Sequence, residues 1–136
     1  MPDKMCLTIM SGSIDRLTGA AVLVSAAVSM DMEVEIFLQL WGVHAFRKDV
    51  MQKNMNLAEF GELGEQVAKR MQELKLPMWF ELLKQAKELG KVKIYACSLA
   101  SNIWGVKKED LEMVDEIIGA GEWVEKMREA KINLFI

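Results

Sequence analysis

Short runs of β-forming residues alternate with longer helical segments along the whole chain, and this alternation limits the fold more than any other feature. Strands that alternate with helices favour a mostly parallel sheet with helices on both faces, because each connecting helix packs back against the sheet. The sequence therefore predicts an α/β protein. Its five expected strands are residues 5–10, 33–40, 92–96, 112–118 and 132–136.

The segments between these strands have the periodicity of helices, which are expected at residues 14–30, 57–74, 78–89, 99–104 and 121–130. Pro77 ends the second helix and is suited to the first turn of the third. Residues 48–56 are polar apart from Met51 and Met55 and are expected to be a mobile or partner-contacting loop. In the second helix, apolar residues recur every three to four positions and define one face: Leu57, Phe60, Leu63, Val67, Met71 and Leu74.

A chain of 136 residues is expected to form a single domain, residues 1–136. Its formal net charge of −3 gives no electrostatic reason to expect nucleic acid or an anionic membrane as a partner. The longest apolar run, residues 17–30, is shorter than the roughly 20 residues that a membrane span needs. We therefore expect no membrane span and a cytoplasmic protein.

Metal and cofactor signatures are also missing from the sequence. The two cysteines, Cys6 and Cys97, lie far apart, which argues against a disulfide scaffold and a zinc site. His44 is the single histidine, so a histidine-rich metal site is excluded. Neither GxGxxG nor GxxxxGK[ST] occurs, and no cofactor and no metal are expected.

The stretch KVKIYACSLASNIWG, residues 91–105, contains the main candidate for chemistry. It predicts a buried strand at residues 92–96 with Cys97 at its C-terminal end, then Ser98 as a helix N-cap and a helix that begins at Leu99. Ligands of open α/β sheets bind outside the carboxyl ends of strands, and the positive end of a helix dipole stabilises a thiolate. Cys97 is thus a candidate nucleophile. The alternative is an inert buried thiol, since free cysteine is among the most buried residue types.

Two other segments are expected at the same edge of the sheet. The second strand leads into residues 41–48, which include His44, a residue that can orient or deprotonate a thiol because its pKa lies near neutrality. A surface or hydrogen-bonded histidine without a chemical role is the alternative. The first strand leads into the turn Ser11, Gly12 and Ser13, where Ser13 is expected to cap the next helix.

Over nearly its whole length the chain resembles the DsrE/DsrF-like sulfur-relay family, and particularly its stand-alone archaeal and bacterial members. The resemblance depends on the opening strand with SGSIDRL, on FLQLWGVHAF, on KIYACSLASNIWGVKKEDL and on the closing helix with INLFI. It implies a three-layer α/β/α sandwich with a five-stranded parallel sheet, and homo- or hetero-oligomers. It also implies that one cysteine carries sulfur as a persulfide or thiosulfonate, and Cys97 matches that position.

The resemblance implies sulfur exchange with small TusA-like carriers and rhodanese-like donors, which would make the protein a possible sulfurtransferase. In this hypothesis Cys97 and His44 are the catalytic residues. The expected binding residues, which supply amide groups or an apolar wall around the sulfur, are Ser11, Gly12, Ser13, Trp41, Gly42, Ser98, Leu99, Ala100 and Trp104.

Two alternatives from other functional classes stay open. One is a non-catalytic oligomeric interaction or regulatory protein that binds a partner through its apolar surface. The other is a module of the same fold that binds a small, flavin-like molecule in the crevice at the strand ends. An unreactive Cys97 would favour the first, and a co-purifying coloured ligand would favour the second.

Overall fold

The computed structural model describes residues 2–136 and contains one five-stranded sheet in which every neighbouring pair is parallel. In chain order the strands are β1 (Lys4–Ile9), β2 (Glu33–Leu38), β3 (Val92–Cys97), β4 (Glu116–Ile118) and β5 (Ile132–Phe135). Their spatial order is β4-β3-β2-β1-β5, which places β2 at the centre. The predicted α/β sandwich is confirmed, with a sheet that is parallel throughout.

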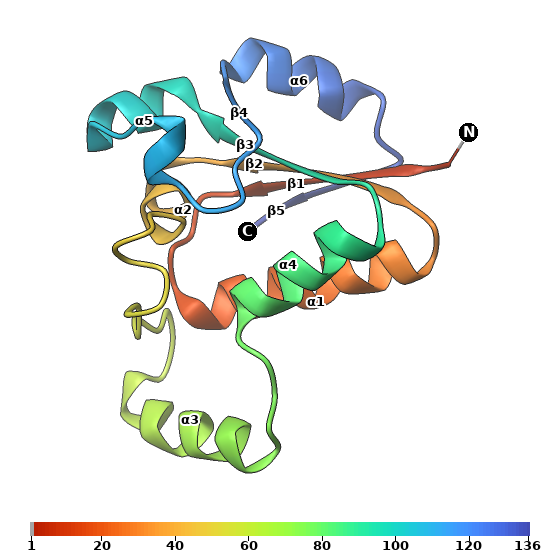
Figure 1. The fold of residues 1–136 in the computed structure, drawn as a ribbon. Coiled ribbons are helices and arrows are strands. Elements are labelled where there is room, and N and C mark those ends of the chain that lie inside the picture. Colours follow the sequence, from red (N-terminus) through yellow and green to blue (C-terminus); the bar gives the residue numbers. More distant parts are fainter. Residues whose placement is uncertain (1) are drawn as a thin grey trace.

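Helices form the outer layers, as Figure 1 shows. On one face of the sheet α1 (Ile14–Ser29) packs beside α4 (Trp79–Leu89), and α6 (Ala120–Arg128) covers the opposite face. Two short helices, α2 (Leu40–Ala45) and α5 (Ser98–Trp104), contact each other at the carboxyl end of the strands. The remaining elements are α3 (Gly64–Glu73) and two 3₁₀ turns, η1 (Gly61–Leu63) and η2 (Lys108–Asp110).

The apolar residues of the strands explain this layering. Leu7, Ile36 and Ile94 lie side by side on β1, β2 and β3 and are fully buried under α1 and α4. On the opposite face the ring of Phe37 stacks on Trp123 of α6, with ring centroids 5.2 Å apart. A strand buried on both faces needs apolar residues on both, which accounts for the nearly continuous apolar runs in the sequence.

Three of the predicted elements differ from the structure, and long-range hydrogen bonds explain two of the differences. The predicted second strand ends at Leu38, and residues 40–45 form α2, whose Gly42 amide donates to the Met10 carbonyl (3.0 Å). The predicted fourth strand shortens to β4 because the Glu112 amide bonds to Phe46 instead of the sheet. The helix predicted over residues 57–74 is regular α-helix only within α3.

Two helix starts also differ from the prediction. Pro77 lies just before the N-cap of α4, which is Met78, and so falls outside the first helical turn. The N-cap of α5 is Cys97 rather than Ser98, because Cys97 keeps extended strand backbone while Ser98 is already helical. Gly105 ends α5 with a left-handed φ of 64°, a conformation that favours glycine.

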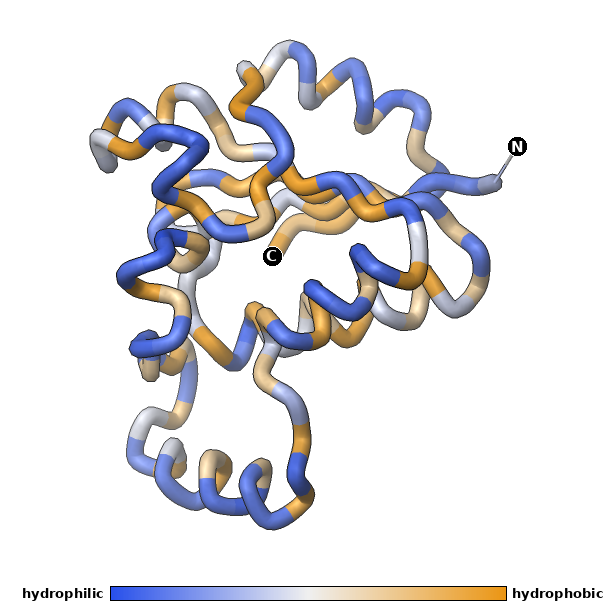
Figure 2. The backbone as a smooth tube through the Cα atoms, viewed as in Figure 1, coloured by the Kyte–Doolittle hydropathy of each residue, from blue (hydrophilic) through white to orange (hydrophobic). Residues whose placement is uncertain are grey.

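The segment around α3 stands away from the sheet. Figures 1 and 2 show it as an arm, residues 57–76, that extends from the body of the molecule. None of the residues of α3 is buried. Within residues 2–136, no helix combines the length and the apolar character that crossing a membrane requires.

Candidate functional site

A cleft of about 450 Å³ opens at the carboxyl ends of β1 and β5. It lies where the order of the strands changes direction. From β1 the chain adds β2, β3 and β4 on one side, whereas β5 pairs with β1 on the other side. Ligands of open α/β sheets bind in crevices at such reversal points. The cleft is lined by Met10, Ser11, Gly12, Ser13, Arg16, Trp41, His44, Asn54, Asn56, Ala58, Phe135 and Ile136.

The turn between β1 and α1 forms the floor of this cleft. The amides of Met10 and Ser11 donate to the Ile136 carbonyl at 2.7 and 3.2 Å, which ties the turn to the end of β5. The hydroxyl groups of Ser11 and Ser13 lie 3.0 Å apart. Gly12 has no room for a side chain, since a Cβ there would lie 2.7 Å from the carbonyl oxygen of Trp41. The close approach of α2 to this turn therefore requires glycine.

An aromatic cluster forms the next wall. Trp104 of α5 stacks on His44 with ring centroids 4.5 Å apart and meets Trp41 edge-on at 5.3 Å. The indole N–H of Trp104 donates to the Leu40 carbonyl at 2.6 Å, which fixes α5 against α2. A Cβ at Gly42 would overlap the carbonyl oxygen of Ile9, so Gly42 allows α2 to lie directly on the end of β1.

The surroundings of His44 favour its neutral form. Burial and then the positive charge of Arg47 lower the pKa of its imidazole below the ordinary value of 6.5. Its Nδ1 atom is buried and has no hydrogen-bond partner within the described residues. A neutral imidazole with a free nitrogen can accept a proton.

Cys97 lies at the end of β3, on the other side of β2 from the cleft. It is a free thiol, 8% exposed, and pairs in the sheet with Ile118 of β4. The first turn of α5 follows it directly, with Leu99 exposed and Ala100 buried. Cys97 therefore has the predicted position between strand and helix, but it is not part of the lining of the cleft.

The structure divides the predicted site residues into two groups. Five of them line the cleft: Ser11, Gly12, Ser13, Trp41 and His44. Four lie at the β3–α5 junction: Cys97, Ser98, Leu99 and Ala100. Trp104 connects the two groups because it belongs to α5 and stacks on His44, and Gly42 is buried beneath the cleft. Within residues 2–136 no hydrogen bond joins His44 to Cys97.

Sequence reasoning missed three polar residues of the cleft. Arg16 lies in the first turns of α1. Asn54 is buried, and its amide group donates to the Gly12 carbonyl (2.8 Å) and accepts from the Asn56 amide (3.1 Å). The only available signal was the pair of asparagines two residues apart in a segment that was predicted to be a mobile or partner-contacting loop.

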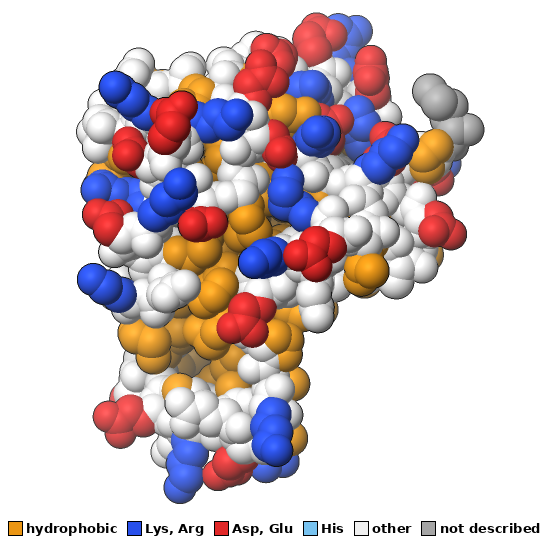
Figure 3. All heavy atoms as spheres, viewed as in Figure 1, with side chains coloured by type: hydrophobic (Ala, Val, Ile, Leu, Met, Phe, Trp, Pro, Cys, Tyr) orange, Lys and Arg blue, Asp and Glu red, His pale blue; other side chains and the backbone are white. Residues whose placement is uncertain are grey.

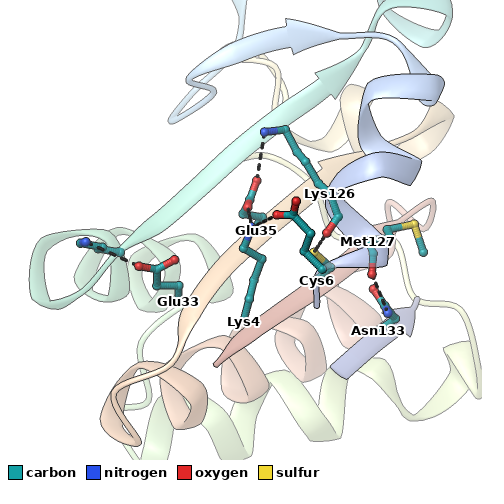
Figure 4. A network of polar contacts seen from close by, with 9 residues as sticks. Lys4, Cys6, Glu33, Glu35, Lys126, Met127 and Asn133 are labelled. Atoms are coloured by element: carbon teal, nitrogen blue, oxygen red, sulfur yellow. Dashed lines mark hydrogen bonds and ion pairs between the residues drawn. The ribbon is translucent and has the colours of Figure 1, made fainter. Parts of the chain in front are cut away.

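The second cysteine, Cys6, lies in a different polar environment beneath α6. Figure 4 shows Lys4 of β1 and Lys126 of α6 reaching the carboxylate of Glu35 from two sides. The Sγ atom of Cys6 points toward the Lys126 carbonyl at 3.9 Å. Burial and then the negative charge of Glu35 raise the pKa of the Cys6 thiol to about 11. Cys6 is therefore a protonated core residue at neutral pH.

Residues 2–136 contain no group of three or more histidine, cysteine, aspartate or glutamate side chains placed to hold a metal ion.

Comparison with known proteins identifies relatives along the whole chain. The sequence profile of the DsrE/DsrF/DrsH-like family matches residues 2–78 and 50–135. The uncharacterized protein YrkE of Bacillus subtilis (strain 168) is 26% identical over 98% of this chain and 96% of its own length. Two solved structures share the fold. The Escherichia coli ychN protein has a TM-score of 0.58 at 16% identity, with both chains fully covered. Protein MTH1491 of Methanobacterium thermoautotrophicum, of unknown function, has a TM-score of 0.55 at 17% identity, covering 98% of this chain and 99% of its own.

Proposed function

The chain belongs to the DsrE/DsrF/DrsH-like family, and we propose that it is a sulfur-relay protein that carries sulfane sulfur or a thiosulfonate group on Cys97. One observation carries the proposal: Cys97 is both the last residue of β3 and the N-cap of α5. The first amide groups of a helix have no acceptor within the helix, and they favour an anion at that end. A thiolate or a persulfide on Cys97 is such an anion.

Transfer on this thiol is a simple exchange of one sulfur–sulfur bond for another. The thiolate of Cys97 attacks the outer sulfur of a donor persulfide, R–S–S⁻, and the donor leaves as R–S⁻. The product is Cys97–S–S⁻, and no net oxidation occurs because one S–S bond forms while one breaks. An acceptor thiolate then removes the outer sulfur in the same way. With a thiosulfonate donor such as tetrathionate, attack on an inner sulfur releases thiosulfate.

The surroundings of Cys97 support storage of a reactive sulfur. The thiol is nine-tenths buried, and the aromatic cluster of Trp41, His44 and Trp104 borders α5. Apolar surroundings limit hydrolysis and oxidation of a bound persulfide. His44 is proposed as a secondary proton acceptor, because its lowered pKa keeps one ring nitrogen free at neutral pH.

The proposed partners follow from the family. They are small TusA-like sulfur carriers as acceptors and rhodanese-like proteins as donors, with the chain acting as a homo-oligomer in the cytoplasm. Each of these partners presents a cysteine persulfide or thiolate, so the exchange needs close docking at the β3–α5 junction. Leu99 is 67% exposed beside Cys97 and gives a docking protein an apolar contact at this junction.

Mass spectrometry after incubation with tetrathionate or polysulfide tests the proposal. We expect a mass gain of one sulfur atom or one thiosulfonate group that maps to Cys97 and reverses with dithiothreitol. The Cys97→Ser variant should lose this gain, and Cys6→Ala should keep it. A wild-type protein that gains no mass, or that gains it in the Cys97→Ser variant, would contradict the assignment.

A second candidate function is favoured by the cleft between β1 and β5. It lies at the reversal point of the sheet and combines the polar groups of Ser11, Arg16 and Asn54 with the aromatic wall of Trp41. Such a mixture is typical of sites for small molecules. A flavin-like or other small ligand that co-purifies and protects Trp41 from fluorescence quenching would support this function. Loss of this ligand in the Arg16→Ala variant, together with an unreactive Cys97, would favour small-molecule binding over sulfur relay.

A further inference from the structure

The arm, residues 57–76, presents an apolar face that residues 2–136 cover only in part. Its helix α3 has no buried residue, although apolar positions recur along it as they do in a core-facing helix. Figure 3 shows apolar side chains gathered in the hollow between the arm and the body. Six apolar residues in and beside the arm each leave 42–68% of their surface exposed: Met55, Phe60, Leu63, Val67, Leu74 and Leu76.

The arm is held firmly at its base. The Ile14 amide donates to the Asn56 carbonyl at 2.8 Å, and the carboxylate of Asp15 accepts from the Ala58 amide at 3.1 Å. At the other end the chain re-enters the core at Trp79, which is 1% exposed, three residues after the arm ends. The exposed face is therefore presented in a defined position, as a preformed binding surface requires.

The exposure of this surface fits a protein partner. The six residues are each exposed over roughly half of their surface, and apolar surface gathered on a monomer in this way marks an interaction site.

The spacing of the apolar residues is symmetric about Val67. Leu63 and Met71 lie four residues away on either side, and Phe60 and Leu74 lie seven residues away. When two α3 helices pair in antiparallel fashion with Val67 on the two-fold axis, Val67 meets its own copy, and Leu63, in the turn just before α3, lies beside Met71 of the other copy. Phe60 and Leu74 lie outside α3 and flank this contact. A two-fold interface requires this kind of self-complementary surface.

The charges of the arm agree with the same orientation. Acidic residues precede Val67, namely Glu59, Glu62 and Glu65, and three of the four charged residues that follow it are basic, namely Lys69, Arg70 and Lys75. A parallel pair would place like charges side by side. An antiparallel pair places the acidic half of one arm beside the basic half of the other.

We propose that the arm is the docking surface for a second copy of this chain, with the two α3 helices antiparallel and crossing at Val67. This goes beyond sulfur relay, and it holds whether or not Cys97 carries sulfur. The Val67→Glu variant, compared with wild type by sedimentation equilibrium at micromolar concentration, tests it. We expect the mass of the assembly to fall by half or more, and circular dichroism to stay unchanged because Val67 is exposed.

The matched control is Leu89→Glu, which places the same charge on an 80% exposed leucine of α4 and should leave the mass unchanged. A monomeric wild type, or an assembly that survives Val67→Glu, would overturn the proposal. Vesicles of phosphatidylglycerol provide a second contrast. If wild type binds them as a monomer and Val67→Glu does not, the face serves a membrane surface and the proposal is wrong.

Cross-linking tests the orientation. Val67→Cys should form a disulfide with its own copy under mild oxidation, because the two-fold axis brings the two sulfurs together. Lys69→Cys lies on the opposite side of α3 and should stay reduced. The cross-linking variants carry Cys97→Ser as well, because Cys97 is itself expected to react with thiol reagents, whereas Cys6 is buried. Efficient cross-linking through position 69 but not through position 67 would exclude the proposed pairing.

Discussion

The ammonium group of Lys4 lies 2.6 Å from the carboxylate of Glu35, between neighbouring strands and beneath α6. Glu35 also receives Lys126 from α6 at 3.5 Å, so one buried carboxylate connects β1, β2 and the helix that covers them. Burial opposes the charge of Glu35, but the hydrogen bond and charge of Lys4, with the charge of Lys126, hold its pKa below the ordinary value of 4.5. The pair is therefore ionised throughout the neutral range.

Replacing Glu35 by glutamine should destabilise the protein. The variant leaves the charges of Lys4 and Lys126 without a buried partner, and breaking a buried ion pair on one side costs about 3–5 kcal/mol. Urea unfolding should show a lower midpoint with an unchanged slope. The control is Glu33→Gln, whose partner Lys91 is largely exposed, and its cost should stay below about 1 kcal/mol. Equal losses in the two variants would contradict this account.

The same carboxylate predicts how stability depends on pH. Because the folded pKa of Glu35 lies below its unfolded value, its contribution is complete above about pH 4.5 and is lost as the pH falls through the folded pKa. Unfolding free energy measured from pH 6 down to pH 3 should therefore decline more steeply for wild type than for Glu35→Gln. Asp15 and Asp115, whose pKa values are also lowered, supply the slope that remains in the variant. If the unfolding free energies of wild type and Glu35→Gln fell equally with pH, the protonation of Glu35 would not be coupled to folding.

The two cysteines should differ in reactivity. The Cys6 thiol has a pKa of about 11 and is 1% exposed, so iodoacetamide at pH 8 should leave it unmodified in the folded protein. In the folded protein, modification should map to Cys97 alone. In urea, where the protein is unfolded, Cys6 and Cys97 should both react. Peptide mapping by mass spectrometry checks this. Labelling of Cys6 before unfolding would mean that α6 opens readily.

Two glycines should respond in opposite directions to the same methyl group. At Gly12 a Cβ would lie 2.7 Å from the Trp41 carbonyl, so Gly12→Ala must displace α2 and should cost about 1–3 kcal/mol. Gly19 lies within α1 with nothing near its Cβ position, so Gly19→Ala should stabilise the helix by about 0.5–1 kcal/mol. Thermal unfolding measures both changes. A neutral Gly12→Ala would show that the turn has room to adjust.

The fold could be predicted from local pattern because β1, β2 and β3 are buried, mostly apolar runs of strand length, and the edge strand β5 is a short apolar run as well. The helix α2 could not be predicted, since its position depends on a bond between Gly42 and Met10, which are distant in sequence. Periodicity around Val67 correctly indicated an amphipathic helix. It could not show that this face contacts none of the chain's own core.

The site was predictable only in part for a similar reason. Residues that follow a strand can be placed at the carboxyl edge of a sheet, which located Ser11, His44 and Cys97 in general terms. The order of the strands decides which of them share a crevice, and sequence gives no strand order. The separation of Cys97 from the cleft by the central strand β2 follows from that order. Whether Cys97 carries sulfur stays a prediction for the mass measurements described above.

Asn56 and Ala58 belong to two surfaces at once, because they line the cleft and their backbone groups also anchor the arm to the first turn of α1. Any protein that restrains the arm therefore restrains one wall of the cleft as well. By thermodynamic reciprocity, if self-association changes the affinity of the cleft for a ligand, that ligand changes the affinity of self-association by the same factor. Assembly and occupancy would then report on each other, although the two surfaces share no contact with a common ligand.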